Sequence, residues 1–455
     1  MRLLLFAIIT LCLGACATSS TIPNNFKVPE YQEKTLSNGL KVLLFKDDRL
    51  PAFSMELMIM SGYANDSMAK SGMANMTASM LNKGAGKYSA QKLAEEIEFL
   101  GSKYGSSVGS ESTNLKISGL STNTDRMLEL FSQILLQPRF QKKEFHRLRK
   151  RTIASIKKQL DSPSGFASKS FDEFVFGEHP YGRTAAGEIK DLNSMRVSDL
   201  KNYYQKYYSP KNSYLAVVGK FDPNIVSRLE ESFGSWENKP VKNLNFSEAP
   251  KAKGIEIRLM AKEDLKQSQV RIGHVGPERK IKEYLELRVG LGILGSGLSG
   301  RLMEEIRSKR GLTYGIYSGV SFGKTSGKIV VRSSTRNEKV GELVGESIRQ
   351  LELLVDQGVT SDEVKRSKAY FLGNFPRAIE TPAKLAGNIL TLRLWGIEDS
   401  YLNDYIKNIN SISKSDVNRA LRKYLDPKNL KIVVFGPSSV AEQLREIGVL
   451  KVENL

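Results

Sequence analysis

The sequence predicts an α+β protein made of two homologous halves, and two observations support this. Strand-like and helix-like patterns mix along all 455 residues. The segment 206–212 (KYYSPKN) also recurs 217 residues later as 423–429 (KYLDPKN). After each copy comes an apolar run that a glycine closes, at 215–219 and at 432–436. A repeat of this length indicates a duplicated domain.

The individual elements follow from local patterns. An Asn-Gly pair at 38–39 lies between two strand-like runs, which is the strongest short-range indication of a hairpin. Apolar residues at helical spacing predict helices over 89–100 and 124–136, and alternation predicts a strand over 114–120. The segment 105–109 matches G-x-S-x-G, but it follows a helix and precedes a strand, so we expect a flexible loop there and no nucleophile elbow.

The repeat also indicates how the chain divides. In each copy a helix ends before proline, the Pro-Lys-Asn turn reverses the chain, and a buried strand runs back. A polar stretch at 237–253, which contains two prolines, separates the copies. We therefore expect an N-terminal domain at 28–240 and a C-terminal domain at 254–455.

The first residues have the pattern of an export sequence. The apolar run from Leu3 to Ala15 is shorter than the about 20 residues that span a bilayer. Small residues precede Cys16, as in a bacterial lipobox, so we expect residues 1–15 to be a lipoprotein signal peptide and Cys16 to carry the lipid. The alternative is a plain signal peptide with a chance cysteine. Residues 16–27 would form a polar tether, and because Ala17 is not the aspartate of inner-membrane retention, we expect the outer membrane, facing the periplasm.

Composition limits the chemistry of the chain. The net charge of +19 suits acidic partners, but a lysine-rich surface explains it as well, and no basic, aromatic-interleaved strand indicates nucleic-acid binding. Only Cys16 would remain after cleavage, so neither an internal disulfide nor a multi-thiolate metal site is possible. The three histidines, His146, His179 and His274, do not pair at the helical spacing of a zinc motif.

A frame of short motifs resembles the surroundings of the inverted zinc motif H-x-x-E-H in M16 (insulinase-like) peptidases. The frame consists of Ser61-Gly62, Ser71-Gly72-Met73-Ala74 and the segment 80–84. Within it, Asn75 and Ser79 occupy the two histidine positions, and Ala78 occupies the position of the glutamate base. The family's third ligand, a glutamate shortly before Asp161-Ser162-Pro163, is replaced at Ala154-Ser155.

The resemblance therefore implies that this chain binds no zinc and has no catalytic residue of its own. Amide and hydroxyl groups alone are poor zinc ligands, and alanine cannot move a proton. A further landmark is 179–182 (HPYG), and the similarity covers nearly all of 30–440. It implies two LuxS/MPP-like metallohydrolase-type halves, each with a mostly antiparallel sheet packed with helices.

The second half keeps a motif that resembles the family's C-terminal Arg/Tyr signature. It comprises 297–302 and 305–314, and the matching residues are Arg307 and Tyr314. The resemblance implies substrate binding, with forked donors from the arginine and a hydroxyl that can stabilise an oxyanion. The alternative is an ion pair between Arg307 and Glu304, with Tyr314 as a half-buried strand residue. Nearby glycines at 290–300 lack the Gly-Lys-Ser/Thr of a phosphate loop, so we expect close packing or a hinge.

Three functions are compatible with these features. The first is a non-catalytic subunit of a heteromeric M16 zinc peptidase, which adds peptide binding and the Arg/Tyr pair to a zinc-bearing homologue. The second is a catalytically inert scaffold or binding lipoprotein. The third is an independent enzyme with an unrecognised site.

Overall fold

Two six-stranded sheets organise the computed structural model, which describes residues 27–242, 246, 248–297 and 299–454. The first sheet contains β1 (Gln32–Thr35), β2 (Lys41–Lys46), β3 (Ala52–Ile59), β4 (Lys103–Val108), β5 (Thr113–Leu120) and β6 (Ser213–Gly219). The second contains β7 (Ile255–Ala261), β8 (Gln267–Gly276), β9 (Ile316–Ser321), β10 (Gly327–Arg336), β11 (Leu430–Gly436) and β12 (Val449–Asn454).

The two sheets have the same topology apart from one edge strand. Their orders are β1-β2-β6-β3-β5-β4 and β12-β7-β11-β8-β10-β9, so β2 to β6 correspond in order to β7 to β11. The repeated segments lead into β6 and β11, which occupy equivalent inner positions. Only β2–β6, β7–β11 and β7–β12 pair in parallel, and the other neighbours are antiparallel. The predicted α+β fold of two mostly antiparallel halves is confirmed.

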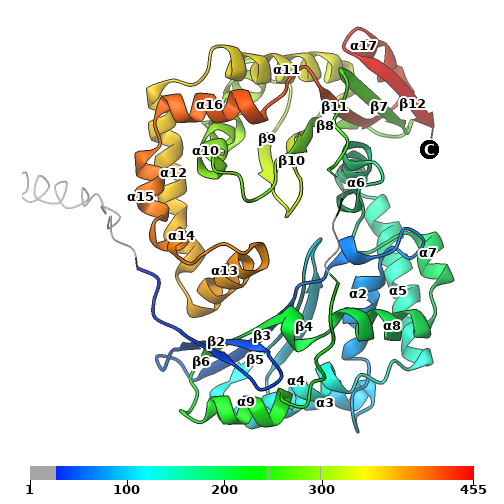
Figure 1. Ribbon diagram of the computed structural model, residues 1–455. Helices are drawn as coiled ribbons and strands as arrows, with labels where there is room; N and C mark the ends of the chain where they lie inside the picture. The colour runs from blue at the N-terminus through cyan, green and yellow to red at the C-terminus, as the bar shows by residue number, and fades with distance from the viewer. Residues whose placement is uncertain (1–26, 243–245, 247, 298, 455) are drawn as a thin grey trace, which may run out of the picture.

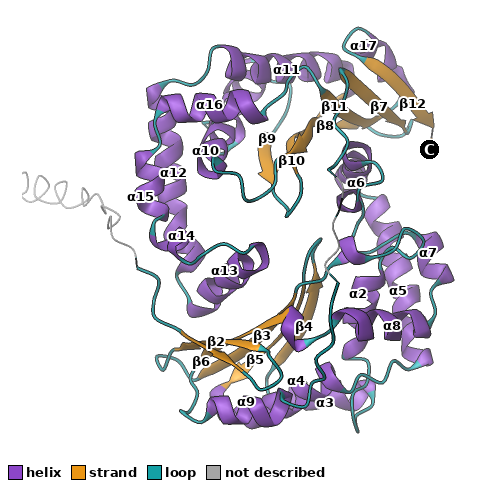
Figure 2. Cartoon of the chain, in the orientation of Figure 1, coloured by secondary structure: helices purple, strands orange, loops and turns teal. Residues whose placement is uncertain are grey.

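Helices surround both sheets (Figure 2). The first half contributes α2 (Met73–Leu81), α3 (Ala90–Phe99), α4 (Thr124–Leu136), α5 (Lys142–Leu160), α6 (Pro163–Phe176), α7 (Ile189–Ser194), α8 (Val197–Tyr207) and α9 (Ile225–Phe233). The second half contributes α10 (Tyr284–Gly295), α11 (Val340–Asp356), α12 (Ser361–Ile379), α13 (Pro382–Trp395), α14 (Ser400–Asn403), α15 (Tyr405–Ser411), α16 (Lys414–Tyr424), α17 (Ala441–Arg445) and the π-helical segment η5 (Met303–Lys309). Short 3₁₀ turns are η1 (Tyr63–Asn65), η2 (Ser121–Asn123), η3 (Pro180–Gly182), η4 (Pro210–Asn212), η6 (Asn337–Lys339) and η7 (Ser438–Val440).

Most local predictions agree with these elements, and one is wrong. The hairpin β1–β2, the helices α3 and α4 and the strand β5 confirm the sequence patterns. The expected flexible loop at 105–109 is instead mostly part of β4, an edge strand that pairs with β5. Its glycine and serines have little strand preference, so the ladder of β5, and not the segment itself, orders them.

Each half covers the other's sheet with one helix. Helix α6 of the first half packs on β8 and β11, and α13 of the second half packs on β6 and β2 (Figure 1). Both helices have 14 residues and begin with proline after a capping side chain, Ser162 or Thr381, which accepts a backbone N–H. Each half therefore contributes one helix to the packing of the other. The domain ranges 28–240 and 254–455 remain predictions.

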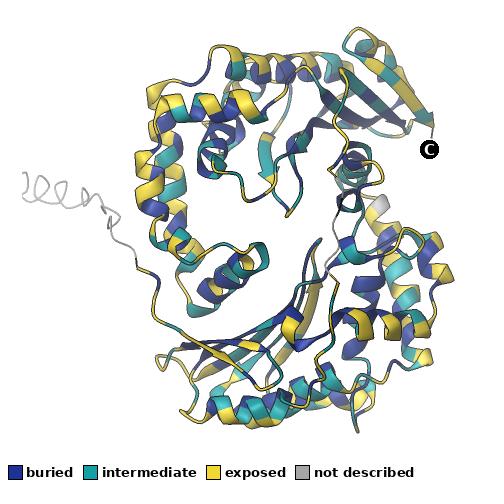
Figure 3. Cartoon of the chain, in the orientation of Figure 1, coloured by how far each residue is buried: buried dark blue, intermediate teal, exposed yellow. Residues whose placement is uncertain are grey.

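Apolar residues alternate between two packed faces in each sheet. In the first sheet, Met55 and Leu57 face a core with α4 and α9, whereas Phe45 and Val218 join the core of the second half. The inner strands of both sheets are accordingly mostly buried, whereas the edge strands β1, β4 and β12 and the outer faces of the helices carry exposed residues (Figure 3). Sheets covered on both faces bring residues from both halves close together.

The N-terminal predictions lie outside the described residues. Residues 1–26 comprise the predicted signal peptide, Cys16 and most of the predicted tether, so lipidation of Cys16 remains a prediction. Over the described ranges, the structure contains no helix with the length and hydropathy needed to traverse a bilayer.

Candidate functional site

Helix α2 carries three of the positions that the resemblance aligns with the zinc motif. Asn75 and Ser79 lie one helical turn apart and are both partly exposed, whereas Ala78 is fully buried in the core of the first half. Ser155 is exposed on α5, which packs against α2, and the hydroxyl of Thr152 on α5 lies 3.7 Å from the sulfur of Met76 on α2. The structure thus places these four residues on two neighbouring helices.

A buried carboxylate fixes the start of α2. Asp66 accepts hydrogen bonds from the backbone N–H groups of Gly72, Met73 and Ala74, at 2.7, 3.1 and 2.9 Å. These amides have no partner within the helix, and a negative charge at this end also favours the helix dipole. Burial raises the pKa of Asp66 to about 7, although the three amides stabilise its ionised form. Asp66 therefore fixes the position of α2, the helix on which the resemblance places the zinc motif.

The residues at these positions do not fit zinc. Asn75 and Ser79 offer an amide and a hydroxyl, Ala78 offers nothing, and Ser155 offers a second hydroxyl. Within the described ranges, no group of three or more His, Cys, Asp or Glu side chains is placed to hold a metal ion. Zinc needs imidazole, thiolate or carboxylate ligands, so no step of a reaction can be assigned to a metal here.

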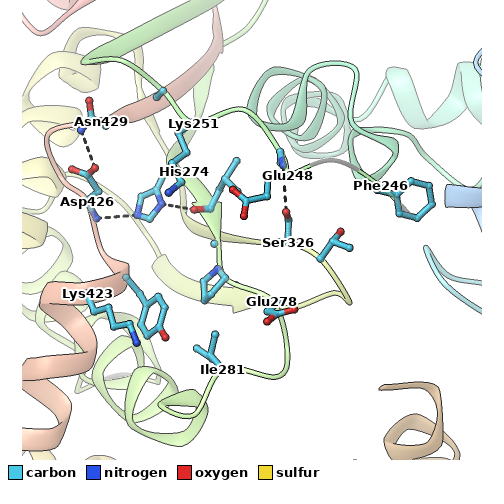
Figure 4. A pocket seen from close by; sticks show the side chains of 17 residues that line it. Phe246, Glu248, Lys251, His274, Glu278, Ile281, Ser326, Lys423, Asp426 and Asn429 are labelled. Atoms are coloured by element: carbon cyan, nitrogen blue, oxygen red, sulfur yellow. Dashed lines mark hydrogen bonds between the residues drawn. The ribbon is translucent and has the colours of Figure 1, made fainter. Parts of the chain in front are cut away.

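The three histidines occupy other places. His274 lines a cavity of about 590 Å³, where its Nδ1–H faces the carbonyl of Val275 at 2.8 Å and its Nε2 accepts from the N–H of Asp426 at 3.2 Å (Figure 4). Burial lowers the pKa of His274, so the ring is neutral and both nitrogens are used. His179 accepts from the N–H of Tyr181, and His146 lies exposed on α5.

The landmark 179–182 helps to hold the halves together. The hydroxyl of Tyr181 donates to the buried carboxylate of Glu111, which also accepts from the N–H of Lys324 at 2.6 Å and the indole of Trp395 at 3.0 Å. Lys324 and Trp395 belong to the second half. Sequence patterns could not single out Glu111, because a single acidic residue in a loop has no periodicity.

Arg307 and Tyr314 lie side by side in the structure, and their role in substrate binding remains a prediction. The guanidinium of Arg307 lies over the ring of Tyr314, 5.2 Å from its centroid, and the Tyr314 side chain is 90% exposed. Arg307 makes no ion pair with any residue that the structure describes, since Lys309 pairs with Glu304 instead. The alternative of an Arg307–Glu304 pair with a half-buried strand tyrosine is therefore wrong. Both donors are free to meet a ligand.

The segment that presents this pair is held at both ends. Arg307 belongs to η5, a π-helical turn of a kind that is frequent at functional sites. Ile306 and Leu312 are buried beside it, and the hydroxyl of Thr313 donates to the carbonyl of Ser334 on β10 at 2.6 Å. The buried anchors leave the side chain of Tyr314 as the exposed part of a fixed turn.

The nearby glycines serve close packing. A Cβ on Gly295 would lie 2.5 Å from the backbone nitrogen of Ser318 on β9, and one on Gly290 would lie 2.8 Å from Leu421 on α16. The backbone of β9 leaves no room for a side chain at position 295, and at position 290 the side chain of Leu421 would have to shift, so glycine lets α10 approach β9 and α16 closely. Of the two expectations for these glycines, close packing is therefore the one that the structure supports.

An ion pair anchors the residues before η5. Arg301 donates to both carboxylate oxygens of Glu363 at 2.6 and 2.8 Å, and to the carbonyl of Gly358 at 2.8 Å. Burial opposes the ionised form of Glu363, yet its hydrogen bonds from Arg301 and the Thr360 amide lower its pKa to about 2.

We expect Glu363→Gln to destabilise the fold by about 2 kcal/mol at neutral pH, because charged hydrogen bonds are lost. The native pKa of about 2 lies below the ordinary value of 4.5, so the contribution is present above pH 4.5 and is lost as the pH falls toward 2. Urea unfolding of both proteins from pH 7 to pH 3 measures the difference. A stability gap that stays constant or widens toward pH 3 contradicts the prediction.

Comparisons with known proteins agree with this architecture. The family model described as insulinase (peptidase family M16) matches residues 41–188, and the model described as peptidase M16 inactive domain matches residues 194–371. The chain belongs to the M16 peptidase family.

Its relatives are named as zinc proteases. The uncharacterized zinc protease YmxG of Bacillus subtilis is 24% identical over 412 residues, which cover 89% of this chain and 98% of the relative. The zinc protease PqqE of Helicobacter pylori is 24% identical over 418 residues, covering 90% and 94%.

Solved structures share the fold. A peptidase M16 inactive domain from Pseudomonas fluorescens has a TM-score of 0.84 at 24% identity and covers 90% of this chain and 98% of that one. The periplasmic protease PqqL from Escherichia coli has a TM-score of 0.77 at 14% identity, covering 92% of this chain and 49% of that one.

Proposed function

We propose that this chain is a non-catalytic subunit of a heteromeric M16-type zinc peptidase. It would bind peptide and supply Arg307 and Tyr314 to a zinc-bearing homologue that carries the metal and the general base. The observation that carries this proposal is the pair formed by the partly buried Arg307 and the exposed Tyr314, which has no ion-pair partner among the described residues. A purely structural arginine would be expected to use its donors within the fold.

The chemistry of the two sites supports this division of labour. The positions on α2 and α5 offer no ligand suited to zinc, whereas Arg307 and Tyr314 offer a guanidinium and a hydroxyl, which are donors suited to a substrate carbonyl. An extended peptide would add as a strand to a sheet edge in the partner. The arginine fork would then hold a peptide carbonyl, and the tyrosine hydroxyl would donate to the oxygen on which charge develops.

Location belongs to the same proposal. A lipid on Cys16 would anchor the chain, with the outer membrane facing the periplasm as the expected site. The similarity to a protease described as periplasmic supports this compartment. The alternative function, a catalytically inert scaffold or binding lipoprotein, predicts the same anchor but no effect on a partner's activity.

Reconstitution tests the proposal. We expect the purified chain alone to contain no stoichiometric zinc and to cleave no peptide. Mixing it with an H-x-x-E-H homologue from the same genome should produce peptidase activity that neither protein has alone, and a chelator should abolish that activity. A zinc-bearing homologue that forms no complex with this chain, or that is equally active without it, would falsify the proposal. Stoichiometric zinc in the isolated chain would refute it as well.

A further inference from the structure

A second arginine, separate from the Arg/Tyr pair, is buried without an anionic partner. Arg279, in the loop between β8 and α10, is only 5% exposed. Its guanidinium carbon lies 3.3 Å from the ring centroid of Tyr284, 4.9 Å from that of Tyr401 and 5.5 Å from that of Trp395. Three aromatic faces therefore surround the cation.

The hydrogen-bonding groups of this arginine are not satisfied by the protein. Its Nε is enclosed and has no acceptor, and no carboxylate in the described ranges forms an ion pair with its side chain. Burial of an unpaired cation costs several kcal/mol, and cation–π contacts return only about 0.5–2 kcal/mol each. An acceptor from outside the chain would complete the site.

The beginning of α10 lies beside this arginine. Tyr284, Leu285 and Glu286 form its first turn, and all three line the same cavity as Arg279. Their backbone N–H groups donate to no described residue, and the residue before them, Glu283, provides no side-chain cap. Unpaired amides and the positive end of a 12-residue helix favour a bound anion.

Two lysines near Arg279 add positive charge to the cavity. Glu283 is already engaged, since it accepts from Lys423 at 2.9 Å and from the hydroxyl of Tyr424 at 2.8 Å. Lys280 and Lys282 line the cavity, whose volume is about 500 Å³, and the Nζ of Lys280 lies beside Gly396. Against these three cations, Glu286 is the one carboxylate of the lining within the described ranges.

We propose that this cavity, formed by Arg279, Lys280 and the first turn of α10, binds an oxyanion of the phosphate or carboxylate type. The oxyanion accepts from the guanidinium and from the free amides, while Lys280 and Lys282 add charge at the rim. The site is independent of zinc and of the proposed partner. Two sources share this chemistry, namely a free phosphate-like anion and the C-terminal carboxylate of a peptide.

Calorimetric titration of the full chain with inorganic phosphate, at constant ionic strength, tests the site. We expect saturable binding that Arg279→Met weakens by about tenfold or more, because a charged hydrogen bond is lost. Lys280→Gln should weaken binding by a smaller factor, and Glu286→Gln should strengthen it, since a repulsive charge is removed. Arg366→Met is the matched control, because Arg366 is exposed on α12 and does not line the cavity.

The variants keep the test decisive even if one of them unfolds. Arg279→Met removes a cation from an aromatic cage and could prevent folding, whereas Lys280 is exposed and Glu286 is only partly buried. The proposal fails if phosphate does not bind below about 10 mM. It also fails if Lys280→Gln and Glu286→Gln leave the affinity unchanged.

A second arm identifies the source of the oxyanion. A short peptide with a free C-terminal carboxylate and its carboxamide analogue each compete with phosphate in the same titration. Competition by the acid form alone supports the site with a peptide terminus as its ligand. If neither form competes while phosphate binds, the site is supported with a free phosphate-like anion as its ligand. If the peptide acid and the carboxamide compete equally, the site does not recognise a carboxylate, and a peptide C-terminus is excluded as its ligand.

Discussion

Tyr314→Phe is expected to lower kcat of the reconstituted peptidase by about 10²-fold, with little change in KM. The loss of one oxyanion donor typically has this effect, because the hydroxyl acts mainly on charge that develops in the transition state. The side chain is 90% exposed, so the fold should not change. Steady-state kinetics of the mixed subunits, with zinc only in the partner, measures the effect.

Tyr317→Phe is the matched control for this experiment. Tyr317 lies three residues further on, in β9, and its side chain is also exposed, at 47%. Its hydroxyl should make no difference to kcat. Full activity of Tyr314→Phe in an active mixture would exclude the oxyanion role and favour the inert scaffold.

Arg307 extends the same argument to substrate binding. Arg307→Lys keeps the charge but loses the planar fork, so we expect a higher KM and a smaller change in kcat than for Tyr314→Phe. Lys309→Ala removes an exposed cation from the same turn and provides the control. Equal effects of both substitutions would indicate a general loss of positive charge and not a specific contact.

The second large effect is expected for Arg271→Met, which should destabilise the protein by about 3 kcal/mol. Arg271 on β8 is 3% exposed and reaches α6 of the other half. Its guanidinium donates to the hydroxyl of Ser168 at 3.1 Å, to the carbonyl of Ser164 at 3.0 Å and to that of Ser333 at 3.2 Å. Methionine would remove these hydrogen bonds, two of which reach α6, and urea unfolding measures the loss.

Arg332→Met is the control for Arg271→Met. Arg332 pairs opposite Arg271 in the β10–β8 ladder but is exposed. Burial, with the neighbouring charge of Arg332, lowers the pKa of Arg271 to about 10, so removal of Arg332 should leave stability unchanged or raise it slightly. If both variants lose the same stability, the contact between α6 and the second sheet is not what Arg271 contributes.

Part of the fold could be predicted because the sequence itself carries the responsible physics. The Asn-Gly turn before β2 and the apolar spacing in α4 act over a few residues, so both were predicted correctly. The segment 105–109 failed for the opposite reason, since β4 is ordered by hydrogen bonds to β5 and not by its own composition. The packing of α6 on the second sheet and of α13 on the first could not be predicted either, because no periodic pattern in the sequence indicates it.

The candidate sites also differ in what the sequence alone could predict about them. Residue identity alone determined that Asn75, Ala78, Ser79 and Ser155 offer no imidazole or carboxylate, because ligand chemistry is a property of the side chain. Only the tertiary structure decided that Arg307 stacks on an exposed Tyr314, and that Arg279 is buried among three rings beside the start of α10. Burial depends on segments distant in the chain, and the rings around Arg279 come from 284 and from 395–401, which meet only when the second half folds.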